Sequence, residues 1–209
     1  MALVITVAQQ KGGAGKTMLA ANLAAAMAQN RRVCLVDIDP QRSLSRWHEI
    51  RSGQKKPLAA ISLSNVSGWR LRAELDRLMA SHDALIVDTP PQVETDAKLA
   101  IRAAHLVLVP LQPSPPDFWA AGATVQLAQA ERRPLRLVLN RAPATSTLRS
   151  FVEREVKASG QEMLNTAIGN RAGFANAFAQ GLGITEAGPK TRAAAELLAV
   201  LAEIEELTA

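Results

Sequence analysis

A glycine-rich segment near the amino end, AQQKGGAGKTM at residues 8–18, constrains this chain more than any other feature. It follows an apolar run, LVITV, and precedes a helix-like run, LAANLAAAMAQ. Glycines between a strand and a helix let backbone N–H groups converge on phosphate oxygens, and the helix dipole adds to the attraction. The segment ends in Gly15-Lys16-Thr17, but Gln10 stands where the pattern G-x-x-x-x-G-K-T has its first glycine. The sequence therefore predicts a phosphate-binding loop of an unusual type.

The rest of the chain alternates apolar runs with helical patterns, which predicts an α/β fold with a doubly wound, mostly parallel twisted sheet flanked by helices. The runs are rich in Val, Leu and Ile, as in parallel strands buried on both faces. A chain of 209 residues suits one domain with a core, so we expect a single P-loop domain over residues 1–209. Strands are expected at 2–8, 32–38, 83–89, 105–111 and 135–141, with weaker candidates at 60–64 and 162–168. Helices are expected near 16–29, 42–51, 68–81, 93–103, 117–131, 146–159, 171–180 and 191–207.

The composition argues against several classes of protein. A single cysteine, Cys34, excludes a disulfide framework and a multi-cysteine metal site within one chain, and its place in an apolar run predicts a small core residue. No apolar run approaches the roughly 18 residues of a membrane span, and no signal-peptide pattern is present, so we expect a cytoplasmic protein. The net charge of +5 fits contact with a polyanion and fits an arginine-rich soluble surface equally well.

The two lysines of the glycine-rich loop carry a family resemblance. The run KGGAGKT at residues 11–17 resembles the deviant Walker A motif of the ParA/MinD superfamily of ATPases. Lys16 is expected to reach the β- and γ-phosphates of ATP, and the Thr17 hydroxyl to bind Mg²⁺ directly. The resemblance implies that Lys11 crosses a dimer interface to the phosphates held by the other subunit. Met18 stands where a second threonine is common, which should leave the phosphate cradle intact. The nucleotide-binding residues expected here are Lys11, Gly12, Gly13, Ala14, Gly15, Lys16, Thr17 and Met18.

Aspartates downstream extend the resemblance. The run DIDPQ at 37–41 resembles switch I of the family, and Asp39 matches the residue that positions the attacking water and approaches Mg²⁺ through water. An Asx turn before the next helix is a second role open to Asp39, compatible with the first. Asp37 is expected to support the loop. The run ALIVDTPPQ at 84–92 resembles a Walker B strand followed by switch II, so Asp88 is expected to approach the metal through water.

Two later segments resemble the parts of the family that lie at the adenine. VPLQPSPPDFWAAG at 109–122 resembles the proline-containing loop of small ParA-type proteins, which implies a place near the base for Pro113. LVLNR at 137–141 contains Asn140, which matches the family asparagine that reads the adenine edge; a turn residue after a strand is the alternative. The resemblance is close over residues 2–142 and looser over the C-terminal part.

Missing features narrow the branch of the family. Iron–sulfur relatives need paired cysteines and bacterial tyrosine kinases a tyrosine-rich tail, and the chain has one cysteine and no tyrosine. The last segment, AAAELLAVLAEIEELTA, is amphipathic but acidic, unlike the basic membrane helix of MinD-type proteins, so no membrane partner is expected. The phosphate loop begins within the first dozen residues, which leaves no room for the helix-turn-helix region of large partition ATPases. The chain therefore resembles the small ParA-type, ParF-like ATPases.

That branch implies a slow ATPase that positions plasmids, chromosomes or protein clusters. ATP and Mg²⁺ would close a homodimer on non-specific DNA, giving a nucleoid-associated state, and a ParB-like or cargo-adaptor protein would stimulate hydrolysis and release it. Binding through DNA phosphates requires lysines and arginines on one face. The first candidates for that face are Arg171, Lys190 and Arg192, and the others are Arg149, Arg154 and Lys157.

A metabolic ligase of the dethiobiotin-synthetase type is the alternative function. Such enzymes share a phosphate loop that ends in G-K-T, but they generally lack a lysine at the position of Lys11. They also need a pocket for a second substrate, and no motif for one is evident. The nucleotide-switched positioning ATPase is therefore preferred.

Overall fold

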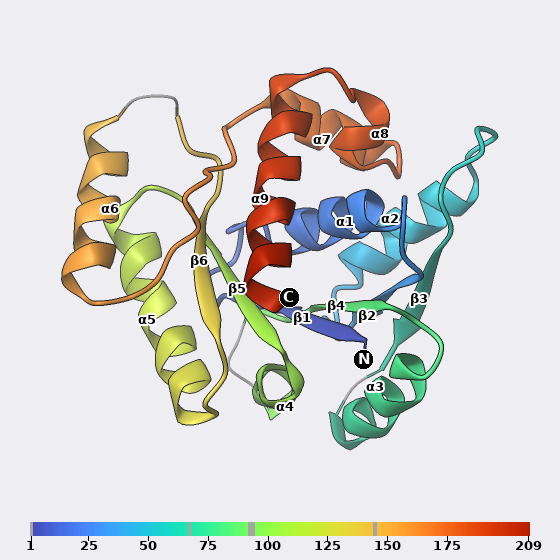
Figure 1. Ribbon diagram of the computed structural model, residues 1–209, viewed down its shortest axis with the longest axis horizontal. Helices are drawn as coiled ribbons and strands as arrows, with labels where there is room; N and C mark the ends of the chain where they lie inside the picture. Colours follow the sequence, from blue (N-terminus) through green and yellow to red (C-terminus); the bar gives the residue numbers. More distant parts are fainter. Residues whose placement is uncertain (1, 67, 92–94, 144–145) are drawn as a thin grey trace.

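The computed structural model describes residues 2–66, 68–91, 95–143 and 146–209 and shows a sheet with helices on both faces (Figure 1). Six strands lie in the order β3-β2-β4-β1-β5-β6, and each pairing is parallel. The strands are β1 (Leu3–Val7), β2 (Val33–Asp37), β3 (Ile61–Asn65), β4 (Ala84–Asp88), β5 (Leu106–Leu111) and β6 (Leu135–Leu139). The predicted fold class is confirmed, and the carboxyl ends of the strands meet at one edge, where open α/β sheets bind ligands.

Two layers of helices cover the sheet, one on each face. One layer consists of α1 (Lys16–Met27), α2 (Ser43–Ser52), α7 (Ala172–Ala179), α8 (Ile184–Ala187) and α9 (Arg192–Thr208). The other consists of α3 (Leu71–Met79), α4 (Thr95–Ala103), α5 (Pro115–Ala130) and α6 (Thr147–Ala158), with a 3₁₀ turn, η1 (Gly68–Arg70), before α3. No helix in these described ranges is long and apolar enough to cross a membrane.

The apolar strands are buried on both faces because successive side chains serve different helix layers. On β1, Ile5 and Val7 pack in the cluster formed with α1 and α9, whereas Val4 packs in the cluster formed with α3. Cys34 on β2 lies in that second cluster and is fully buried, as predicted, and burial raises the pKa of its thiol to about 12. The absence of polar–apolar alternation in these runs therefore has a direct structural cause.

Some predicted elements differ from the structure. The candidate strand at 162–168 is wrong: this segment makes one isolated bridge, Leu137 to Met163, and a few backbone hydrogen bonds along the edge of β6 without becoming a strand. No helix or strand was predicted over 181–190, but this segment contains the short helix α8. The expected helix at 93–103 is seen from Thr95 onward, and residues 92–94, including the end of the switch II motif, lie outside the described residues.

Candidate nucleotide-binding site

The predicted phosphate loop lies between β1 and α1, at the carboxyl edge of the sheet. Its shape depends on two glycines with positive φ, Gly13 at 80° and Gly15 at 94°. A Cβ atom on Gly15 would lie 2.3 Å from the Nδ2 atom of Asn140, so only glycine fits there. Gly15 is also the N-cap of α1, and no side chain of the described residues caps that helix. The first N–H groups of α1 are therefore available to a phosphate.

A pocket of about 430 Å³ opens over this loop. Switch I contributes Asp39 and Gln41, the first residue of α2 contributes Ser43, and switch II contributes Pro91. The far wall belongs to α7. The lining residues from the loop itself are Gly12, Gly13, Gly15, Lys16, Thr17 and Met18. Six of the eight loop residues predicted to bind nucleotide thus surround one cavity, and the other two, Lys11 and Ala14, lie in the same loop.

Lys16 is a buried cation at the floor of this site, with 7% of its surface exposed. Burial lowers the pKa of its ammonium group, and the nearby charges of Asp88 and Asp39 oppose that shift. A buried ammonium group is costly unless it faces negative charge. The phosphates of a nucleotide would supply that charge from the open side of the pocket.

Asp88, at the end of β4, is the buried carboxylate expected of a Walker B strand. It is 1% exposed, and neither carboxylate oxygen has a hydrogen-bond partner among the described residues. Burial raises the pKa of Asp88 to about 7. An unpartnered buried carboxylate beside a phosphate loop suits hydrated Mg²⁺, which is usually held by one or two carboxylates together with phosphates and waters. Thr17, Asp39 and Asp88 are the residues that would hold the ion.

The two aspartates of switch I have different environments. Asp37 is buried, and its carboxylate accepts hydrogen bonds from the backbone N–H groups of Asp39 and Ser45 and from the Ser45 hydroxyl. This confirms that Asp37 supports the loop. Asp39 is half-buried, lines the pocket, and accepts a hydrogen bond from the N–H of Gln41. The Asx turn and the place at the pocket therefore occur together at Asp39.

Lys11 has a partner within its own chain. Its ammonium group lies 2.5 Å from Oδ2 of Asp117, in the first turn of α5, and the Ser114 hydroxyl donates to the same oxygen. The Lys11 side chain is 39% exposed, whereas that of Asp117 is 3% exposed. The lysine is therefore held at the surface of the loop by a buried carboxylate.

Asn140 and Pro113 flank the loop from outside the pocket. Asn140 is 3% exposed; its amide donates to the carbonyl of Ala14, and its Oδ1 accepts from the N–H of Arg141. Pro113 is buried, and its neighbour Gln112 donates to the carbonyl of Gly13. Both segments thus support the phosphate loop, and the contacts of Asn140 and Pro113 with adenine stay predictions.

Comparison with known proteins agrees with this geometry. The model of the CobQ/CobB/MinD/ParA nucleotide binding domain family matches residues 5–184. The chain belongs to this family. It is 30% identical to the maintenance of carboxysome distribution protein A of Halothiobacillus neapolitanus over 202 residues, covering 93% of this chain and 92% of that protein. The chromosome-partitioning ATPase Soj of Thermus thermophilus is 28% identical, with 88% of each chain covered. A variant of Cyanothece McdA solved with ATP has the same fold: the TM-score is 0.80 at 19% identity, over 99% of this chain and 96% of that one.

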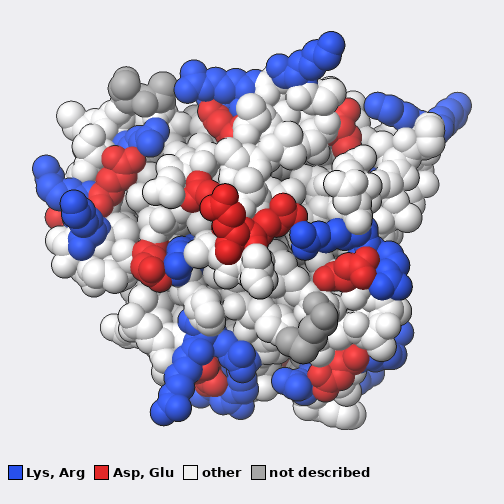
Figure 2. Space-filling view, viewed as in Figure 1, with Lys and Arg blue, Asp and Glu red and all other residues white. Residues whose placement is uncertain are grey.

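The resemblance to ParA/MinD-type proteins implied a cationic face for DNA. Two of its first three candidate residues are held in ion pairs in the structure. Arg171 and Arg192 both lie at Glu196 on α9, with nitrogen–oxygen distances of 2.5 Å and 3.3 Å. Lys190 forms no ion pair within the described residues. Figure 2 shows acidic side chains over the centre of one face, where Figure 1 places α9, and basic side chains around its rim. DNA binding by these residues stays a prediction.

Two parts of this ParA/MinD-type site were not predicted from the sequence. The first is the wall formed by α7, where Ala175, Phe178 and Ala179 line the pocket. The second is Asp117, the partner of Lys11. The run SPPD carried a usable signal, because a serine followed three residues later by a carboxylate is typical of a helix amino terminus. No comparable local signal marks Phe178, which reaches the pocket only through the packing of α7 on α2.

Proposed function

We propose that this chain is a ParA-type ATPase that dimerises on ATP and Mg²⁺, binds DNA without sequence preference and is released when a partner protein stimulates hydrolysis. The observation that carries the proposal is Lys11, a second lysine at the rim of a complete phosphate loop. Half-exposed and held by a single ion pair, it can exchange Asp117 for another anion. In the closed dimer that anion is the phosphate group held by the partner subunit.

The residues of this chain contribute to hydrolysis in two ways: they position the phosphates and the attacking water, and they neutralise negative charge on the phosphates. Lys16 and the N–H groups at the start of α1 hold the β- and γ-phosphates. When bound, Mg²⁺ neutralises charge on the same oxygens. Asp39 orients the attacking water, and Asp37 fixes the loop that carries Asp39. No side chain at the described pocket acts as a strong general base, which supports slow turnover in the absence of the activator.

We further propose that the cargo is a large protein assembly. The support is the identity of 30% to a carboxysome-distribution protein over nearly the whole of both chains. A DNA cargo is the competing proposal, supported by the match to a chromosome-partitioning ATPase over 88% of each chain. In both cases the nucleoid serves as the surface on which the ATP-bound dimer is held.

The deciding experiment measures binding to non-specific duplex DNA with ADP and with ATP, at low and moderate salt. The proteins are the wild type, Lys11→Ala and the double variant Lys11→Ala/Asp117→Asn, which removes the buried charge that the single variant leaves unpaired. We expect the wild type to bind DNA with ATP but not with ADP, and salt to weaken that binding. We expect neither variant to bind DNA with either nucleotide. Binding that ignores the nucleotide, or turnover of ATP without any DNA binding, would contradict the proposal and favour a metabolic enzyme.

A further inference from the structure

The aromatic wall of the nucleotide pocket is supported from behind by a different helix. Phe178 on α7 lines the pocket and is half-buried. Its ring stacks on Trp47 of α2, with ring centroids 6.3 Å apart and an angle of 28° between the planes. Trp47 is 1% exposed and packs in the same cluster as α1. The position of Phe178 therefore depends on how α7 sits against α2.

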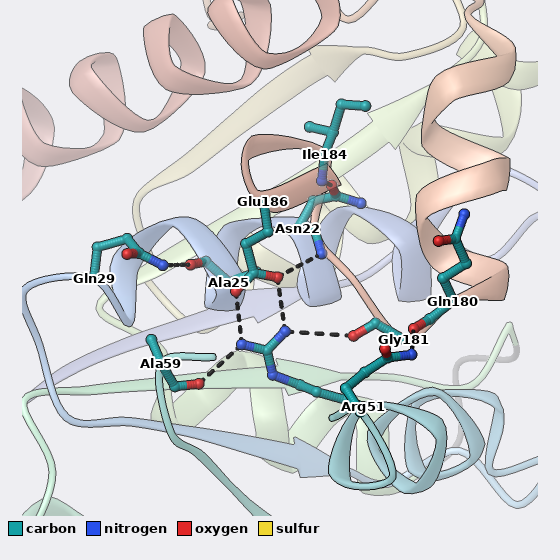
Figure 3. A network of polar contacts seen from close by, with 11 residues as sticks. Asn22, Ala25, Gln29, Arg51, Ala59, Gln180, Gly181, Ile184 and Glu186 are labelled. Carbon is teal, nitrogen blue, oxygen red and sulfur yellow. Dashed lines mark hydrogen bonds and ion pairs between the residues drawn. The ribbon is translucent and has the colours of Figure 1, made fainter. Parts of the chain in front are cut away.

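A buried ion pair fixes that contact (Figure 3). Arg51, in the last turn of α2, donates two hydrogen bonds of 2.7 Å to the two carboxylate oxygens of Glu186 on α8. The guanidinium group also donates to the carbonyls of Ala59 and Gly181, at 2.9 Å and 3.4 Å, and lies 5.4 Å from the ring centroid of Trp47. The side chains of Arg51 and Glu186 are 5% and 6% exposed, so water competes little with the pair.

The backbone around this pair is fitted as closely as the side chains. Gly181, just beyond α7, has a φ of +68°, and a Cβ atom there would lie 2.3 Å from the backbone nitrogen of Arg51. Glu186 also accepts a hydrogen bond from the N–H of Gly183. On the other side, Asn22 of α1 accepts a hydrogen bond from the N–H of Ile184, at 2.8 Å (Figure 3). The helices α1 and α2 are thus both joined to the segment that runs from the end of α7 into α8.

We infer that Arg51 and Glu186 are positioning residues for nucleotide binding: their ion pair holds α7 so that Phe178 faces the phosphate-loop pocket. A buried ion pair is weak evidence for stability, because an apolar pair of the same volume often stabilises as well. The planar fork of Arg51, by contrast, joins Glu186, Ala59 and Gly181 in one fixed geometry, which a flexible apolar side chain cannot do. The inference rests on nucleotide binding by this pocket, and it is independent of dimerisation and DNA binding.

The test measures the dissociation constant for a fluorescent ATP analogue with Mg²⁺, using the full chain at a temperature where every variant is folded. The variants are Arg51→Lys, Glu186→Gln and Phe178→Ala. Arg51→Lys keeps the charge but loses the fork, so it is the variant most certain to fold. Apparent affinity falls in proportion to the fraction of molecules in the binding-competent form. We expect Arg51→Lys and Glu186→Gln each to weaken binding by about tenfold, which corresponds to a binding-competent fraction of about a tenth. We expect Phe178→Ala to weaken binding by a similar factor, because it removes the aromatic wall itself.

A double variant separates positioning from general destabilisation. If Arg51 acts through Phe178, adding Arg51→Lys to Phe178→Ala should weaken ATP binding by less than about twofold further, because the two effects are not additive. Val152→Ala, in the core cluster on the other face, is the matched control for a loss of stability and should leave the dissociation constant unchanged. Unchanged affinity in both Arg51→Lys and Glu186→Gln, or full additivity with Phe178→Ala, would overturn the inference. Failure of the wild type to bind ATP would instead contradict the nucleotide site itself.

Discussion

Lys11 has a structural role as well as a proposed catalytic one, and the two can be separated. Its removal leaves the carboxylate of Asp117, 3% exposed, without its cation. An unpaired buried polar group typically costs about 1–3 kcal/mol. Because Lys11 itself is 39% exposed, we expect Lys11→Ala to lower the free energy of unfolding by about 1 kcal/mol, at the low end of that range. Urea unfolding measures this directly.

The double variant Lys11→Ala/Asp117→Asn provides the control. It should recover most of the lost free energy of unfolding, since the buried charge is gone, and it should still fail to bind DNA with ATP. A Lys11→Ala protein as stable as the wild type would show that the ion pair with Asp117 contributes nothing to folding. In that case any loss of DNA binding would belong to the phosphates alone.

The residues that a motif names were predictable, and the residues that only packing brings together were not. Gly15, Lys16 and Asp88 follow from the spacing of glycine, lysine and carboxylate along the chain. Phe178 stands far from those motifs in sequence, and it reaches the pocket because Trp47 and Arg51 hold α7 in place. Asn140 shows a middle case: its importance was predicted from family resemblance, but its hydrogen bond to Ala14 needed the structure.

The switch I segment gives a prediction about the connection between β2 and α2. The Ser45 hydroxyl lies 2.6 Å from Oδ2 of Asp37 and 2.7 Å from Oδ1 of Asn65, so it links the start of α2 to two strand ends. We expect Ser45→Ala to cost about 1 kcal/mol in the free energy of unfolding. Hydrogen exchange should also become faster at the backbone amides of residues 38–42 other than Pro40, which has none. ATP hydrolysis should become slower, because Asp39 is less firmly placed.

Ser64→Ala is the matched control for Ser45→Ala. Its hydroxyl donates to Glu74 on α3, a similar hydrogen bond that does not touch switch I. Both variants should lose a similar free energy of unfolding, but only Ser45→Ala should change exchange at residues 38–42 and the rate of hydrolysis. Equal hydrolysis rates in the two variants would show that Ser45 stabilises the fold without positioning the loop.

The strands were predictable because they are long apolar runs. The errors concern short segments, such as the one that lies along the edge of the sheet. The buried strands β2 and β4 fall inside the predicted ranges, because continuous burial leaves no alternation to misread. The segment 162–168 has a strand-like composition, yet it lies beside β6 and pairs with that strand only by one isolated bridge to Leu137 and by hydrogen bonds to Leu137 and Leu139. The helix α8 was missed because four residues are too few to show a helical period of apolar side chains. Glu186 stabilises its amino terminus and also binds the distant Arg51.

The distribution of charge over the folded chain bears on DNA binding more than the net charge of +5 does. Acidic side chains gather over α9 while basic ones lie around the rim, as Figure 2 shows, so long-range attraction to DNA is uneven over the surface. Arg171 and Arg192 are engaged by Glu196, which holds them in place but neutralises part of their charge. The ion pairs with Glu196 on α9 therefore lower the positive charge that this face presents to a polyanion.

Removing Glu196 should strengthen DNA binding if Arg171 and Arg192 belong to the DNA-binding face. Glu196→Gln frees two guanidinium groups for phosphates, and each added phosphate contact changes the slope of log K against log salt by about −0.9. We expect the ATP-bound Glu196→Gln protein to bind duplex DNA more tightly at low salt, with a slope steeper by about 1–2. Glu205→Gln, on the same helix, loses the same charge beside Arg31 and serves as the control. Identical slopes in the two variants would place the DNA-binding face elsewhere, with Lys190 and the arginines of α6 as the next residues to change.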